Sequence, residues 1–107
     1  MTTPDAKAAE ERAKKLEERR VNTERFGEEI AALEKTPIPD AWGFPEISAE
    51  HTRLRTKIME MQQLVIRGRF DIPKSQEYER RLVARIHQLE ERARSMQTGR
   101  HVPKPGE

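Results

Sequence analysis

Apolar residues recur at intervals of three and four in two stretches of the second half of the chain. The turn-forming residues Gly68 and Pro73 lie between these stretches. A chain that folds back here brings Val65 opposite Tyr78, and it brings the far ends of the stretches opposite each other. The pattern therefore predicts an all-helical fold with an antiparallel, coiled-coil-like hairpin over residues 48–99. The two stretches are Leu54, Ile58, Met61 and Val65, and Tyr78, Leu82, Ile86 and Leu89.

The first helix of this hairpin carries a wider apolar face than one partner helix can cover. We expect it to begin with Ser48 as its N-cap and to stop at Gly68, and Ser75 or a nearby residue to cap the second helix. A two-helix seam needs only about two apolar positions in seven, so something else must cover the rest of the face. The additional apolar residues are Met59, Leu64 and Ile66.

Residues 1–35 predict a long, highly charged N-terminal helix with a weak first part. Its first two-thirds offer only a thin apolar stripe, so we expect this part to be frayed, freestanding or partly disordered. The stripe consists of Ala6, Ala9, Ala13 and Leu16.

The last third of this helix has a stronger apolar stripe that could dock on the hairpin or on another copy of the chain. Gly27 lowers helix propensity by up to about 1 kcal/mol, unless close packing or a bend requires a glycine there. The stripe consists of Phe26, Ile30 and Leu33.

A proline-rich segment, TPIPDAWGFPEI, occupies residues 36–47 and predicts an extended crossover between the helices. It is also rich in large apolar residues, so it either lies across the hairpin as a lid or inserts into a groove of a partner. These residues are Ile38, Trp42, Phe44 and Ile47. The last segment, residues 100–107, is polar and contains two prolines, so we expect a disordered tail.

The composition allows only a small hydrophobic core, and the charged residues are distributed unevenly between the two halves of the chain. The 107 residues are 34% hydrophobic and 37% charged, which allows at most one domain with a thin core. The net charge of +2 combines a net charge of −4 over residues 1–50 (8 basic, 12 acidic) with +6 over residues 51–107 (13 basic, 7 acidic). The hairpin is therefore basic, which is typical of proteins with an anionic partner or an acidic segment to contact.

Candidate chemistry is sparse. The chain has no cysteine, and none of its three histidines stands at metal-ligand spacing to another. His87 with Glu90 and Glu91 would lack further ligands on a second helix. No nucleophile motif or phosphate-binding glycine loop is present. We therefore predict no catalytic, cofactor-binding or metal-ligating residues, no enzyme activity and no cofactor. The sequence also lacks a leader-type or membrane-spanning apolar segment, which predicts a cytoplasmic protein without a membrane partner.

Four arginines are predicted to gather at one end of the hairpin, where the start of its first helix meets the end of its second. Such a basic end could contact phosphates, although neighbouring acidic residues interleave with it. The four are Arg53, Arg55, Arg92 and Arg94.

The surplus apolar surface predicts a function based on protein contacts. We expect a non-enzymatic helical oligomerisation or adaptor protein, a homo-oligomer or the binder of a protein partner, acting within a larger assembly. The alternative is a nucleic-acid-associated protein, such as a small DNA-packaging adaptor, that uses the arginine-rich end. The predicted contact residues are Phe26, Ile30, Leu33, Trp42, Phe44, Met59, Leu64 and Ile66.

Overall fold

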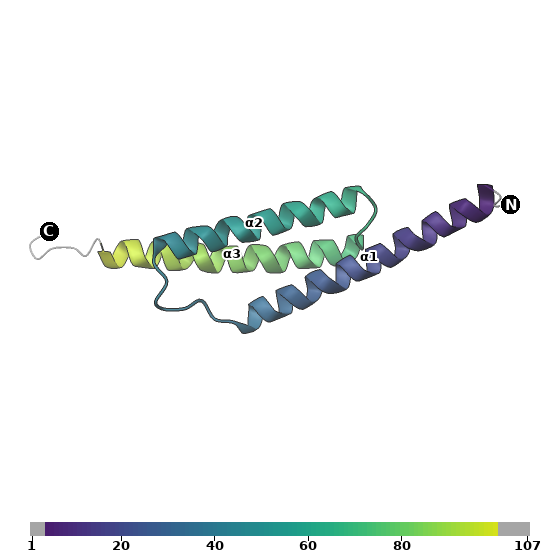
Figure 1. Ribbon diagram of the computed structural model, residues 1–107. Coiled ribbons are helices and arrows are strands. Elements are labelled where there is room, and N and C mark those ends of the chain that lie inside the picture. Colours follow the sequence, from purple (N-terminus) through teal and green to yellow (C-terminus); the bar gives the residue numbers. More distant parts are fainter. Residues whose placement is uncertain (1–3, 101–107) are drawn as a thin grey trace, which may run out of the picture.

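The computed structural model describes residues 4–100, which form three helices and two connections (Figure 1). Helix α1 spans Pro4–Lys35, α2 spans Phe44–Ile66 and α3 spans Ile72–Arg100. Helices α2 and α3 lie side by side as an antiparallel hairpin, and α1 runs along the hairpin and continues past its turn (Figure 1). The predicted all-helical class and the hairpin are confirmed. Arg100 ends α3, and the rest of the predicted tail lies outside the described residues.

The two helices of the hairpin pair close to the predicted register. His51 Nε2 on α2 lies 3.1 Å from Glu90 Oε2 on α3. Nearer the turn, Gln62 Nε2 donates a hydrogen bond to Glu79 Oε1 at 2.7 Å. Both contacts lie beside residue pairs that the apolar stripes predict. The seam contains the buried residues Leu54, Met61, Tyr78, Leu82, Ile86 and Leu89.

Helix α2 begins at Phe44, and its N-cap is five residues before the predicted N-cap Ser48. The N-cap is Gly43, whose backbone N–H donates to Glu46 Oε1 at 2.7 Å. This bond satisfies an amide that the start of a helix otherwise leaves without a partner, and Pro45 fits the first turn because that turn needs no proline N–H. The crossover is therefore only residues 36–43, and the predicted extended segment 36–47 was four residues too long.

The turn between α2 and α3 is set by Gly68 and Asp71. Gly68 has a φ of +72°, and its N–H donates to the Val65 carbonyl while that of Arg69 donates to the Leu64 carbonyl. This pair of bonds is the Schellman motif, so Gly68 ends α2 as predicted. The Asp71 carboxylate accepts the Lys74 N–H at 2.9 Å and caps α3, one turn before Ser75.

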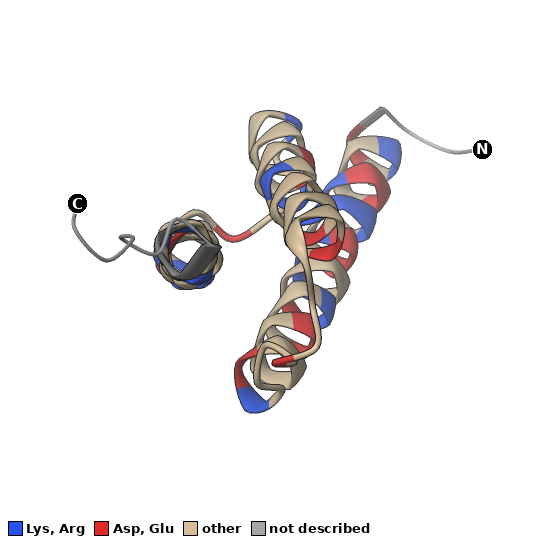
Figure 2. Ribbon diagram, turned by 90° about the vertical axis from the view of Figure 1, so that its left-hand side faces the viewer, with Lys and Arg blue, Asp and Glu red and all other residues tan. Residues whose placement is uncertain are grey.

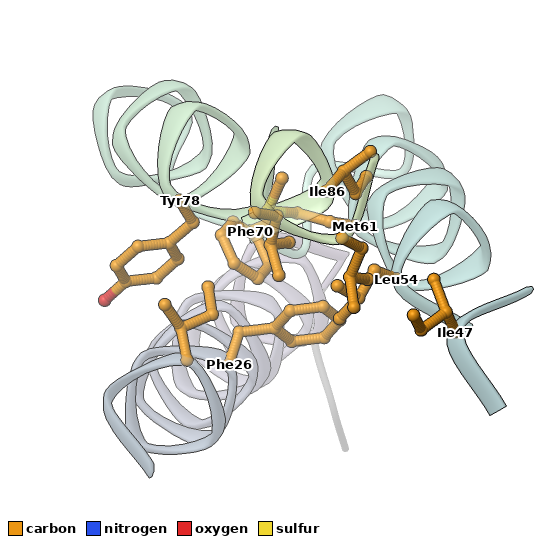
Figure 3. Packing of buried hydrophobic residues seen from close by; sticks show 10 residues of the cluster. Phe26, Ile47, Leu54, Met61, Phe70, Tyr78 and Ile86 are labelled. Atoms are coloured by element: carbon orange, nitrogen blue, oxygen red, sulfur yellow. The ribbon is translucent and has the colours of Figure 1, made fainter. Parts of the chain in front are cut away.

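The core lies between all three helices. Phe26 on α1 points toward the hairpin, where it meets the edge of the Phe70 ring with centroids 5.3 Å apart (Figure 3). Phe70 in turn meets Tyr78 edge-on at 6.1 Å. Such edge-to-face pairs contribute about 0.5–1.5 kcal/mol beyond the burial of their area. The docking of α1 on the hairpin, one of the two predicted alternatives, is therefore what the structure contains.

Gly27 permits this close docking. A Cβ atom at this position would lie 2.5 Å from the Tyr78 hydroxyl oxygen and 3.1 Å from its ring carbon Cζ. Of the two predicted reasons for a glycine, close packing is the one that these distances support.

The middle of α1 holds the turn of the hairpin through polar contacts. Arg19 donates to the Gly68 carbonyl through Nε at 3.3 Å and Nη2 at 3.2 Å, and Asn22 donates to the Arg69 carbonyl at 3.0 Å. The hydroxyl of Thr23 accepts the Asp71 N–H at 3.1 Å. We call this set of contacts the turn clasp. It satisfies backbone groups that a turn leaves without partners, and it fixes where α1 lies along the hairpin.

Candidate interaction surfaces

The residues predicted to contact a partner divide into an inner and an outer group. Phe26 and Ile30 are each 1% exposed, so the folded chain already buries them. Four others are partly buried. Three of these four pack against the core, namely Leu33, Trp42 and Leu64, and the fourth is Phe44. Met59 and Ile66 remain exposed. The chain itself therefore covers most of the apolar surplus, and the free remainder lies on α2.

All three helices carry exposed aliphatic residues in the part of the molecule near the turn of the hairpin. Met59 and Ile66 are seven residues apart, about two helical turns, so they share one side of α2. Ile72 begins α3, directly after the turn, and Leu16 follows Lys15, whose side chain lies against Gly68. All four side chains are 57–75% exposed. We call these four residues the turn surface.

A shallow groove of about 360 Å³ borders the turn surface between α2 and α3. Met61, Val65 and Ile66 line its apolar side, and Ser75 and Glu79 are among the polar residues opposite. The groove gives the exposed Ile66 side chain an adjoining recess of mixed polarity, which is typical of a contact site between helical proteins.

The four predicted nucleic-acid contacts lie in the same part of the molecule, because α2 begins beside the last third of α3. Three of the four already have acidic or carbonyl partners. Arg53 donates to both carboxylate oxygens of Glu50, at 2.6 and 2.8 Å. Arg92 contacts the Pro39 carbonyl and lies 3.5 Å from Asp40, and Arg94 pairs with Glu91.

Arg55 is exposed, and no described residue forms an ion pair with it. Basic and acidic positions also alternate along the helices in general (Figure 2). The predicted basic end is therefore largely neutralised by groups of the same chain.

Other arginines of α3 hold α1 and the crossover in place. Arg81 pairs with Glu34 at the end of α1 and with Glu77 on its own helix. Arg85 donates to the Thr36 carbonyl at 2.5 Å. The basic excess of the hairpin thus partly serves the acidic first half of the chain, which was one of the two predicted uses of the charge division.

Ion pairing lowers several carboxylate pKa values. The hydrogen bond from Arg53 is the largest cause of the lowered Glu50 pKa, and the charge of Arg85 adds to it. The hydrogen bond from Arg81 lowers the pKa of Glu34 in the same way. Each shift favours the ionised carboxylate and therefore stabilises the folded chain at neutral pH.

The described residues contain no group of three or more histidine, aspartate or glutamate side chains arranged to hold a metal ion. The partner of Glu90 is the His51 imidazole on the neighbouring helix, and the hydrogen bond from His51 lowers the pKa of Glu90. None of the helices, as far as the structure describes them, is long and apolar enough to cross a membrane.

Two residues that matter in the structure were not singled out by the sequence patterns. Phe70 lies between the two predicted helices and belongs to neither apolar stripe, yet it is 1% exposed and makes edge-to-face contacts with Phe26 and Tyr78. Arg85 is a charged residue, yet it is only 9% exposed. Its spacing of three from Leu82 and four from Leu89 places it on the buried face of α3, which was the available signal.

Comparison with known proteins finds no matching family model, no similar curated protein and no similar solved structure.

Proposed function

We propose that this chain is a non-enzymatic helical assembly protein that associates with further copies of itself, or with a protein partner, through the turn surface. The supporting observation is that four aliphatic residues near the turn of the hairpin stay 57–75% exposed after the fold has buried most of the apolar surplus. Scattered exposed apolar residues are ordinary, but a group beside a groove is typical of contact sites.

The rigidity of the surroundings supports this proposal. The turn clasp fixes the α2–α3 turn with hydrogen bonds from Arg19, Asn22 and Thr23. The surface is therefore preformed, and the turn loses little conformational entropy when a partner binds to it. A second copy can present the same patch across a twofold axis, which is the commonest arrangement of soluble homo-oligomers.

The test is the mass in solution of the wild-type chain, Ile66→Lys and Thr52→Lys, by light scattering over a concentration series. Both variants add one positive charge at an exposed position of α2, but Thr52 lies at the other end of that helix. We expect Ile66→Lys to weaken self-association at least about tenfold, because a lysine charge is costly to bury, and Thr52→Lys to leave it unchanged.

If the wild-type chain stays monomeric at its highest soluble concentration, the proposed self-association is ruled out. If wild-type and Ile66→Lys chains then also recover the same proteins in affinity capture, the turn surface has no role in partner binding and the proposal fails.

Nucleic-acid association remains the second proposal, with weaker support because only Arg55 of its four predicted residues lacks an acidic or carbonyl partner among the described residues. It predicts binding to DNA or RNA that falls steeply with salt and weakens in Arg55→Glu. A cytoplasmic location likewise stays a prediction from the sequence.

A further inference from the structure

A cleft of about 580 Å³ opens at the other end of the docked α1 helix, between α1, the crossover and the hairpin. Its floor includes the buried side chains of Ile30 and Leu82, and the half-buried Trp42 lines it from the crossover. This volume lies in the range of about 300–1,000 Å³ that is usual for ligand sites. The cleft therefore has the size and the apolar floor of a binding site.

The cleft is also lined by Arg85, a buried cation with no carboxylate at ion-pair distance among the described residues. Its side chain is 9% exposed, and its hydrogen bonds go to neutral groups: the Thr36 carbonyl at 2.5 Å and Gln88 Oε1 at 3.4 Å. Among the side chains that the structure describes, Arg85 Nε is the only buried nitrogen or oxygen without a hydrogen-bond partner. Burial of a guanidinium charge without a carboxylate is costly, so this group is incomplete as it stands.

The other charged groups of the cleft already balance one another. Lys57 pairs with Glu29 across α1 and α2, and Arg53 pairs with Glu50 within α2. Arg85 is therefore the cation of the described cleft lining that has no carboxylate at ion-pair distance. A single negative charge supplied from outside the chain would complete the lining.

We propose that this cleft binds a short acidic peptide segment of a partner protein, whose carboxylate pairs with Arg85 and whose adjacent apolar side chain packs against the half-buried Leu33 and Trp42. Arg85 Nε has no hydrogen-bond partner among the described residues, and the bond from Nη1 to Gln88 is long, so the guanidinium still has donors for a carboxylate. The polar rim of Glu29, Lys57 and Glu50 suits the backbone of a peptide and does not suit a long alkyl chain. The cleft is separate from the turn surface, and this proposal does not depend on assembly there.

The probe is a synthetic library of heptapeptides with a central glutamate between varied apolar residues, together with a matched library that has glutamine at the centre. Trp42 is the only tryptophan of the chain, so its fluorescence reports binding to the full-length protein directly. We expect the best glutamate peptides to bind at least about tenfold more tightly than their glutamine counterparts, because charge-assisted hydrogen bonds are about twice as strong as neutral ones.

Variants locate the contact. Arg85→Met should remove the preference for glutamate, whereas Arg92→Gln should keep it. Arg92 is the matched control, since it also holds the crossover, through Pro39 and Asp40, but does not line this cleft. Ile66→Lys should bind the peptides as the wild type does, which separates this site from the proposed assembly surface.

Three results would overturn the proposal. One is that the wild-type chain binds the glutamate and glutamine libraries equally well, or binds neither library. This comparison needs only the wild-type chain, so it decides the matter even if circular dichroism shows that Arg85→Met does not fold. Another is a glutamate preference that survives in a folded Arg85→Met chain. The third is displacement of the peptides by hexanoate at equal affinity, which assigns the cleft to small free acids instead.

Discussion

The two halves of α1 belong to one continuous helix but meet different surroundings. From Asp5 to Glu18 every side chain is exposed, and the helix extends past the turn of the hairpin (Figure 1). We call residues 4–17 the overhang; at 1.5 Å per residue it is about 20 Å long. Residues 18–35 form the docked half, which supplies Phe26 and Ile30 to the core.

This difference separates helix formation from helix docking. The ion pair that ends the overhang joins Glu17 to Arg20 of the docked half; it is exposed, and such pairs stabilise a helix by only about 0.2–0.5 kcal/mol each. The docked half makes similar local bonds and also buries aromatic and aliphatic side chains. Its position is therefore fixed by packing, whereas the side chains of the overhang stay exposed and its helix depends mainly on local propensity.

The strongest challenge to this comparison is truncation of one apolar side chain in each half. Phe26→Ala should lower the free energy of unfolding by about 3–5 kcal/mol, because the ring is buried and leaves a cavity. Leu16→Ala in the overhang should change it by less than about 0.5 kcal/mol. Urea denaturation followed by helical circular dichroism measures both. Similar losses for the two variants would mean that the overhang is packed in solution.

A second experiment concerns the contact distance between α1 and α3. Gly27→Ala should destabilise the chain by about 1–3 kcal/mol despite the higher helix propensity of alanine, because its Cβ would lie 2.5 Å from the Tyr78 hydroxyl oxygen. Removing that oxygen in the double variant Gly27→Ala/Tyr78→Phe should restore part of the loss.

The matched control for this pair is Tyr78→Phe alone, so that a double-mutant cycle isolates the contact. If Gly27→Ala raises the stability of the chain, the helices are not as closely packed as the structure has them.

The smallest expected effect is on the loss of folding stability at low pH. The pKa of Glu50 is lowered from 4.5, mainly by Arg53, so its contribution to stability is present above about pH 4.5 and is lost as the pH falls through the folded-state pKa. Glu50→Gln should therefore weaken the loss of stability on acidification.

Glu17 is the control from the overhang, because Arg20 also lowers its pKa but both groups are exposed. In about 1 M salt, where the Debye length is about 3 Å, the contribution of Glu17 should vanish while part of that of Glu50 remains. Denaturation between pH 3 and 7 at two salt concentrations measures this, and equal salt sensitivity would contradict it.

The hairpin was predictable because the spacing of its apolar residues fixes both the helices and their pairing. The start of α2 was missed because Gly43 and Pro45 were interpreted only as helix breakers, although both suit the first positions of a helix. The docking of α1 was one of two open alternatives, since the stripe around Phe26 fits a hairpin and a second copy equally well. Whether Arg85 has a carboxylate within ion-pair distance depends on where α1 and the crossover lie, and no local sequence pattern specifies their positions.

The turn clasp also determines the order in which the chain can fold. Its hydrogen bonds join residues 47–49 positions apart, whereas the Gln62–Glu79 bond of the hairpin joins residues 17 apart. Contacts between distant residues form late, because a long loop must close first. During synthesis α1 leaves the ribosome well before Asp71 and Tyr78, so Thr23 and Phe26 emerge without the partners that they later bind. Of the three described helices, α1 is therefore made before the other two and placed after them.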